Sequence, residues 1–180
     1  GYRMKRFISF INPWKYATDE GYQLVHSLYA IGTGGLFGVG LGNSKQKALY
    51  MPEPHNDFIF AIICEELGLI GAIIIISVFL VLIVAGINVA MRAKDKYGRL
   101  LATGIISVIA VQVVINIAVV TGSMPVTGVP LPFISYGGTS LVFNLAAIGV
   151  LLNISSQTKT HKDEIQEKIE RKRIKSKMNI

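Results

Sequence analysis

Apolar residues gather in four long stretches that are separated by polar, basic or proline-rich segments. The stretches cover residues 21–42, 57–91, 100–121 and 139–157. The last three are almost unbroken, with the length that a helix needs to cross the roughly 30 Å hydrocarbon core of a bilayer. The first differs because its second half holds six glycines, which weaken a helix in water but permit close packing or a break in a membrane. The pattern predicts an all-α membrane protein with four transmembrane helices, one of them Gly-rich and open to a break.

The segments between and beside these stretches predict surface structure. Residues 1–20 and the tail 158–180 are rich in lysine and arginine, and they predict basic cytoplasmic segments. Residues 43–56 predict a polar loop. Residues 122–138 contain three prolines and four glycines but remain apolar. They cannot form a spanning helix, so they predict a structured loop in the membrane interface or against other protein.

Composition and charge support this class and orient the chain. Hydrophobic residues make up 51% of the 180 positions and charged residues 16%, against roughly 25% charged residues in a soluble domain. The net charge of +7 comes mostly from short basic clusters that flank the apolar stretches. The positive-inside rule places such clusters in the cytoplasm, so the charge does not indicate a nucleic-acid partner. Four crossings then bring the loops 43–56 and 122–138 to the same outer face.

The strongest candidate for chemistry is Asp57, which follows the rigid polar run 52–56 and opens the second apolar stretch. A carboxylate at a low-dielectric interface, with lysines nearby, can be tuned to accept a proton. An aspartate in this place is also a common helix N-cap. Residue types alone favour the capping role, with which a catalytic role is compatible.

Four further residues of the same loop suit the binding of an anionic, lipid-linked substrate: Lys45, Lys47, Glu53 and His55. Lysines bind phosphate as mobile point charges. Solubility of the loop is the simpler explanation for the lysines, and a hydrogen-bonded loop histidine is the simpler one for His55. No second histidine or cysteine stands at ligand spacing, so the sequence predicts no metal site. No cofactor is evident, although a divalent cation is compatible with these residues.

Polar residues inside the apolar stretches need partners in protein or water. Around a helix, Glu65 stands about 80° from Asp57 and Glu66 nearly opposite it, so the three carboxylates do not share one face. Gln112 and Asn116 are four positions apart and do share a face of the third stretch. For this pair, hydrogen bonding between helices is preferred over a substrate role.

Three runs of the sequence strongly resemble the SEDS family of RodA, FtsW and SpoVE. They are GYQLVHSLYAIGTGGLFGVGLGNSKQK, PEPHNDFIFAIICEELGLIG and PVTGVPLPFISYGGTS. They agree with the family in order and spacing, and the resemblance covers nearly all of residues 3–157. It implies a bacterial membrane protein of ten transmembrane helices, of which this chain looks like a C-terminal fragment with the last four. Such a fragment alone is expected to be inactive.

The resemblance also implies a function and a set of partners. Family members are peptidoglycan glycosyltransferases that polymerise lipid II and release undecaprenyl pyrophosphate at the outer face of the bacterial cytoplasmic membrane. They serve division, elongation or spore cortex synthesis, together with a class B penicillin-binding protein and other divisome, elongasome or sporulation proteins. The family's catalytic aspartate maps onto Asp57. Its second signature loop maps onto 132–138, where Ser135 and Tyr136 are candidate substrate-binding residues.

Two other classes of function fit a polytopic protein with outer loops. A flippase would carry lipid II across the membrane without polymerising it. A scaffold would recruit division or sporulation proteins, and Asp57 would then be dispensable. The product formed from lipid II discriminates between these classes. The three runs do not distinguish the division, elongation and sporulation members.

Overall fold

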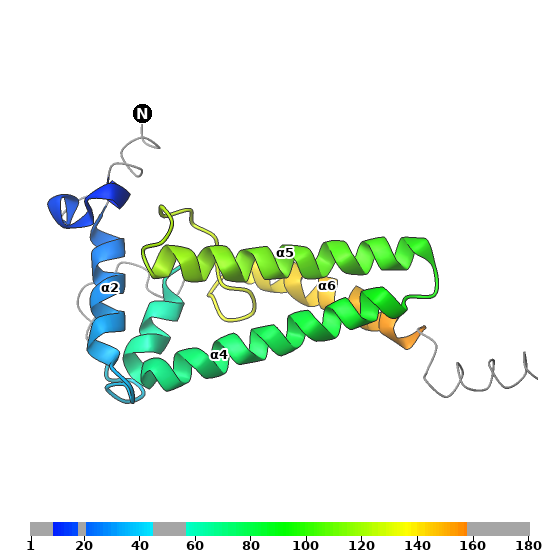
Figure 1. Cartoon of the computed structure of the whole chain (residues 1–180), viewed down its shortest axis with the longest axis horizontal. Helices are drawn as coiled ribbons and strands as arrows, with labels where there is room; N and C mark the ends of the chain where they lie inside the picture. The colour runs from blue at the N-terminus through cyan, green and yellow to red at the C-terminus, as the bar shows by residue number, and fades with distance from the viewer. Residues whose placement is uncertain (1–8, 18–20, 45–56, 158–180) are drawn as a thin grey trace, which may run out of the picture.

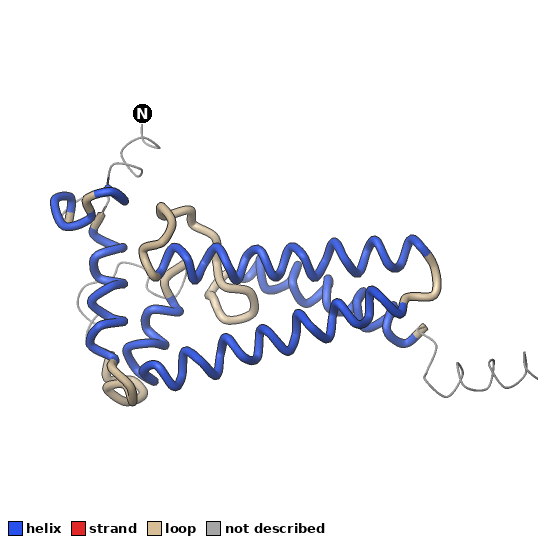
Figure 2. Tube along the Cα trace, viewed as in Figure 1, coloured by secondary structure: helices blue, strands red, loops and turns tan. Residues whose placement is uncertain are grey.

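The computed structural model of the chain describes residues 9–17, 21–44 and 57–157. Within them the regular elements are helical: η1 (Pro13–Tyr16), α2 (Tyr22–Gly34), α4 (Ile59–Arg92), α5 (Lys96–Val120) and α6 (Gly138–Ser156). Helices α4, α5 and α6 run along the length of the molecule, while η1 and α2 lie at one end (Figure 1). Figure 2 shows the same arrangement by secondary structure, with a short turn between α4 and α5 and a long loop between α5 and α6. The predicted tail and most of the predicted segment 1–20 lie outside the described residues.

Three of these helices are long and apolar enough to cross a membrane, namely α4 with 34 residues, α5 with 25 and α6 with 19. A continuous helix pairs its backbone N–H and C=O groups internally, which is what a segment surrounded by lipid requires. Many of their large apolar side chains point away from the protein, including Ile74, Val81, Val114, Phe143 and Leu152. The all-helical membrane fold predicted from the hydrophobic pattern is confirmed.

The Gly-rich stretch differs from these three helices. Helix α2 ends at Gly34 after 13 residues. At 1.5 Å per residue it is about 20 Å long, whereas the hydrocarbon core is roughly 30 Å thick. It runs across the end of the bundle rather than along it (Figure 1). The structure therefore has the predicted helical first half and glycine-rich break, but no described helix over 21–42 that is long enough for a fourth crossing. The number of crossings stays a prediction.

Helices α2 and α4 meet where both are interrupted. Helix α4 kinks at Gly68, whose φ is 68° and ψ −164°. The glycine-rich turn after α2 lies against this kink through four backbone hydrogen bonds, two in each direction, given donor first: Val39 to Glu65 (2.9 Å), Gly40 to Glu66 (3.0 Å), Leu69 to Gly35 (2.9 Å) and Ile70 to Leu36 (3.3 Å). Backbone groups that a kink leaves without partners in their own helix thus find partners in the turn.

Only glycine fits the closest contacts between α2 and α4. A side-chain carbon at Gly34 would lie 1.9 Å from the carbonyl oxygen of Cys64, and one at Gly38 would lie 2.1 Å from that of Glu66. Gly38 also has a φ of +76°, which residues with a side chain rarely adopt. The glycines that interrupt α2 therefore hold the first part of α4 (59–67) close beside it.

The loop between α5 and α6 occupies 121–137, close to its predicted bounds. It begins with a tight turn at Gly122, whose φ is +70°, and the N–H of Ser123 donates to the carbonyl of Ala118 (2.7 Å). The buried hydroxyl of Ser27 on α2 donates to the carbonyl of Val120 (2.7 Å) at the end of α5. This hydrogen bond joins α2 to the end of α5, where the loop starts.

Candidate functional site

Asp57 lies in the turn that leads into α4. Its side chain is half-buried, and the next residue, Phe58, is buried in the core. Phe58, not Asp57, is the N-cap residue of α4. The interpretation of Asp57 as the N-cap is therefore wrong by one position, because the helix begins one residue later than the hydrophobic pattern suggested.

Buried Asn116 joins this turn to the loop between α5 and α6. Its side-chain nitrogen Nδ2 donates to the backbone oxygen of Asp57 and to that of Val129, both at 2.8 Å. A side-chain amide carries two hydrogens, so each carbonyl can receive one. Asn116 is only 1% exposed. The prediction of hydrogen bonding between helices is wrong for Asn116, because its two partners are the backbone of a turn and of a loop.

The carboxylate of Asp57 lies against Gly128 of the same loop. A side-chain carbon at Gly128 would come 3.4 Å from Oδ2 of Asp57, and the φ of Gly128 is +74°. Gly128 precedes Val129, whose carbonyl Asn116 binds. Loop backbone therefore borders the carboxylate on one side. Asp57 and the loop between α5 and α6, both singled out from the sequence, meet in the structure.

Two residues of the second signature run differ in their surroundings. The hydroxyl oxygen of Ser135 accepts a hydrogen bond from the backbone N–H of Leu131 (2.7 Å), so it closes a turn of the loop. Within this turn Phe133 has a φ of +65°, a strained conformation for a residue with a side chain. Tyr136 is 82% exposed. Substrate binding by Ser135 and Tyr136 stays a prediction.

The other four predicted binding residues lie outside the described residues, so their roles also stay predictions: Lys45, Lys47, Glu53 and His55. In the part of the chain that the structure describes, no three histidine, cysteine, aspartate or glutamate side chains gather as a metal ion requires. The described residues offer a half-buried carboxylate, that of Asp57, which can accept a proton.

Glu65 is a buried acid for which sequence reasoning named no partner. The hydroxyl of Ser44 donates to its carboxylate oxygen Oε2, and both side chains are almost fully buried. For the neighbouring Glu66, the buried oxygen Oε1 has no hydrogen-bond partner among the described residues. The two acids thus have separate surroundings, as their helical spacing predicted. The hydrogen bond therefore joins the chain after the glycine-rich turn to the first part of α4.

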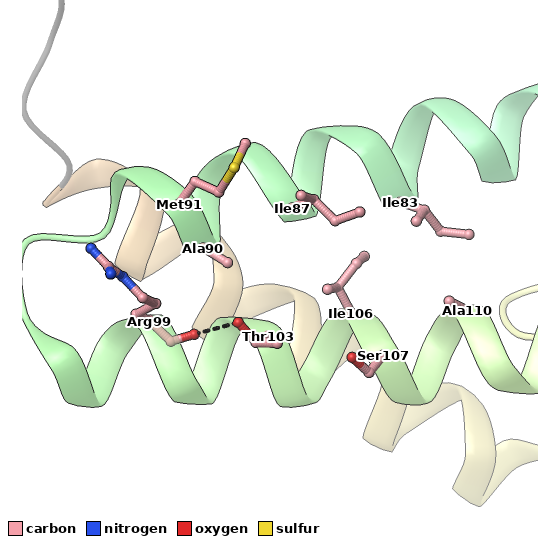
Figure 3. Close-up of a pocket in the computed structure, with 9 residues that line it drawn as sticks. All are labelled: Ile83, Ile87, Ala90, Met91, Arg99, Thr103, Ile106, Ser107 and Ala110. Carbon is pink, nitrogen blue, oxygen red and sulfur yellow. Dashed lines mark hydrogen bonds between the residues drawn. The ribbon is translucent and has the colours of Figure 1, made fainter.

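Two cavities lie along the spanning helices and not at Asp57. One of about 450 Å³ lies between α4 and α5 near Arg99, with Ile83, Ile87 and Ile106 on its walls (Figure 3). The other, of about 610 Å³, lies between α5 and α6 beside Gln112. Neither is lined by Asp57 or by the loop 121–137. The candidate site is defined by the contact between the turn at Asp57 and the loop.

Comparisons with known proteins agree with the resemblance seen in the sequence. A family model described as a cell cycle protein of the FtsW, RodA and SpoVE type matches residues 1–160. Stage V sporulation protein E of Bacillus subtilis is 58% identical over 154 residues, which cover 86% of this chain and 42% of the relative. The probable peptidoglycan glycosyltransferase FtsW of Coxiella burnetii is 52% identical over 160 residues, covering 87% and 43%. The chain spans about 42% of the length of such relatives.

Solved structures show the same likeness. A chain of a peptidoglycan synthase complex, studied for the structural coordination of polymerization and crosslinking, has a TM-score of 0.71 and 28% identity, over 88% of this chain and 43% of that one. A mutant of the rod shape determining protein RodA of Thermus thermophilus has a TM-score of 0.57 and 32% identity, over 74% and 40%. Both likenesses cover more than two thirds of this chain.

Proposed function

The chain belongs to the FtsW, RodA and SpoVE family of cell cycle proteins, and we propose that the full-length protein polymerises lipid II into peptidoglycan glycan strands. The reaction takes place at the outer face of the bacterial cytoplasmic membrane. The observation that carries the proposal is the position of Asp57, a half-buried carboxylate that lies against the loop 121–137 at Gly128. Relatives that bear the name peptidoglycan glycosyltransferase supply the reaction class.

In the proposed mechanism Asp57 is the general base. Its carboxylate takes the proton from the sugar 4-hydroxyl of one lipid II molecule. The hydroxyl oxygen then forms a bond to the anomeric carbon of the growing strand. The bond from that carbon to the pyrophosphate oxygen breaks, the electron pair leaves with lipid pyrophosphate, and the configuration at the carbon is inverted. A half-buried carboxylate can take this role when the sugar hydroxyl lies within hydrogen-bond reach of it.

Other residues would handle the anionic leaving group. Lys45 or Lys47 would offset the charge of pyrophosphate, which lysine does as a mobile point charge. A divalent cation could share that task. Glu53, His55 and the exposed Tyr136 are then the candidates for contacts with the sugar or peptide part of the substrate.

The proposed partner is a class B penicillin-binding protein that crosslinks the strands. Support comes from the similar chain in the peptidoglycan synthase complex, in which polymerization and crosslinking are coordinated. Other division, elongation or sporulation proteins would bring this pair to its place of action. The relatives include both a sporulation protein and FtsW proteins.

An Asp57→Asn variant of the full-length protein tests the assignment. The amide keeps the shape of the side chain but cannot accept the proton, so polymerisation should fall by about 10²- to 10⁴-fold. Polymer is measured on a gel after incubation of the purified protein and its partner with lipid II. The control is Asp95→Asn, which should retain activity. Asp95 is the N-cap residue of α5, at the opposite end of that helix from Asn116.

The Asp57→Asn variant also separates a glycosyltransferase from a flippase and from a scaffold. A flippase would translocate lipid II in vesicles and form no polymer, with or without Asp57. A scaffold would retain its function in cells when Asp57 is replaced. Polymer formation by the Asp57→Asn variant at the wild-type rate would disprove the proposed role of this carboxylate.

A further inference from the structure

We infer that Asn116 is a positioning residue for Asp57, one that fixes the carboxylate against the loop at Gly128. The inference rests on the proposed function, because it assigns to Asn116 a part in the reaction of Asp57. It differs from a catalytic assignment, since the Asn116 side chain contacts protein backbone rather than the reacting atoms.

The geometry sets Asn116 apart from an ordinary buried asparagine. Both of its hydrogen bonds go to backbone oxygens, those of Asp57 and Val129. A hydrogen bond to the main chain restrains the backbone from which a side chain projects, whatever rotamer that side chain adopts. The two acceptors lie 59 and 13 residues away along the chain. The Asn116 side chain therefore binds two segments that are distant in sequence and holds them next to each other.

These two segments are the ones that form the site. Asp57 belongs to a turn before α4, outside the repeating hydrogen bonds of the helix. Val129 adjoins Gly128, the residue against which the Asp57 carboxylate lies. A displacement of either carbonyl away from Asn116 would therefore change the distance between the carboxylate and the loop.

Neighbouring polar residues do not provide the same link. Gln112 lies one turn earlier on the same face of α5, and its oxygen Oε1 has no hydrogen-bond partner among the described residues. Asn144 is a buried asparagine of α6, and its nitrogen Nδ2 donates to Ser140 of the same helix (3.3 Å). Asn144 therefore offers a matched control, with the same residue type and similar burial but no hydrogen bond to the turn or the loop among the described residues.

The predicted effect follows from the need for precise placement. Without Asn116, the part-buried carbonyl groups of Asp57 and Val129 lose their donor, and the turn and the loop can separate to recover hydrogen bonds. A misplacement of about 1 Å can slow a reaction by about 10²-fold. Substrate contacts elsewhere in the protein are unchanged, so the loss should appear in kcat rather than in KM.

The experiment compares Asn116→Leu with Asn144→Leu in the full-length protein with its partner. Leucine branches at the same carbon as asparagine and has the same number of side-chain heavy atoms, but it is larger and has no hydrogen-bond donor. Both variants carry the same increase in volume, so their comparison isolates the lost hydrogen bonds. We expect Asn116→Leu to lower kcat for lipid II polymerisation about 10- to 100-fold relative to Asn144→Leu, with KM changed by less than about threefold. Rates are divided by the amount of folded protein, measured by size-exclusion chromatography.

Equal kcat values for the two leucine variants would overturn the inference, as would a loss confined to KM. If Asn116→Leu does not fold, Asn116→Ser replaces it, since serine is well tolerated in membrane helices but offers one hydrogen on a shorter side chain. A wild-type kcat for that variant would equally overturn the inference. Full activity of Asp57→Asn would instead refute the proposed function, so the two failures are distinguishable.

Discussion

Gly128 lies directly against the carboxylate of Asp57, and a methyl group on this glycine would come within 3.4 Å of Oδ2. Its φ of +74° adds a second constraint, because residues with a side chain pay roughly 1–2 kcal/mol in this left-handed region. A contact at 3.4 Å is an ordinary van der Waals contact, so the strain at this φ is what should move the loop. We expect Gly128→Ala to shift the loop relative to the carboxylate and to lower lipid II polymerisation by about 10-fold or more. The measurement is the rate of glycan polymer formation by the full-length protein.

Gly122→Ala is the matched control for this prediction. Gly122 lies in the same loop with a φ of +70°, and a methyl group there would meet the side chain of Leu28 at 3.5 Å. The backbone strain is thus similar, but the added methyl group is not beside Asp57. A rate for Gly128→Ala equal to that for Gly122→Ala would show that the contact with the carboxylate is unimportant.

The close contact between α2 and α4 predicts that alanine substitutions at two glycines of α2 change the stability in opposite directions. A methyl group at Gly34 would lie 1.9 Å from the backbone oxygen of Cys64, whereas nothing lies within 4 Å of one at Gly32. Gly34→Ala should therefore force the backbones apart and lower the stability by about 1–3 kcal/mol or more. Gly32→Ala should raise the stability by about 0.5–1 kcal/mol, because alanine favours the helix.

Thermal unfolding of the purified protein in detergent measures both effects. Both variants replace a glycine of α2 with alanine, and both substitutions raise the helix propensity. They differ only in the space that the new methyl group meets. Equal melting temperatures for Gly34→Ala and Gly32→Ala would contradict the close backbone contact between α2 and α4.

The buried pair of Ser44 and Glu65 predicts a further loss of stability. The Ser44 hydroxyl donates to the Glu65 carboxylate, and Glu65 is only 2% exposed. Ser44→Ala removes a donor from a buried acid, which should lower the stability by about 1–3 kcal/mol. The control is Ser77→Ala, since the exposed Ser77 hydroxyl bonds the Ile73 carbonyl of its own helix, and its loss should cost less than about 0.5 kcal/mol. Equal melting temperatures for the two variants would show that the pair contributes little.

The sequence predicted individual site residues better than their contacts. Asp57 was recognisable as a carboxylate at the start of an apolar helix, and Asn116 as an amide inside an apolar stretch. Their hydrogen bond was not predictable, because it joins positions 59 residues apart through the packing of α4 on α5. Gly128 was one of several glycines in a proline-rich loop. Only the folded path of that loop shows which of them meets the carboxylate.

The sequence also predicted some of the helices better than others. The three long apolar helices were predictable, because the bilayer requires an unbroken apolar helix of a set length. The stretch 21–42 gave conflicting signals. Its hydrophobicity and the basic residues of 3–15 indicated a crossing, while its glycines indicated a break. The structure shows the physical reason for the break: those glycines are used where the turn after α2 packs on the kink at Gly68.

The final prediction concerns the membrane face on which residues 9–17 lie. Charge alone places them on the same face as the turn between α4 and α5. Helix α2, however, is 13 residues long, too short to cross a core roughly 30 Å thick, and Ser27 joins it to the end of α5 near the loop 121–137. We therefore expect three crossings, which place residues 9–17 and the turn between α4 and α5 on opposite faces.

Single cysteines in a Cys64→Ala background test this expectation with a maleimide that does not cross membranes. Cysteines are placed at the exposed positions Lys15, Lys94 and Ser123. Three crossings predict that positions 15 and 123 react from one side of sealed vesicles and position 94 from the other. Position 94 defines the cytoplasmic face, because its turn is basic and joins two spanning helices. Reaction of positions 15 and 94 from the same side would instead support four crossings, with residues 21–42 supplying the additional span.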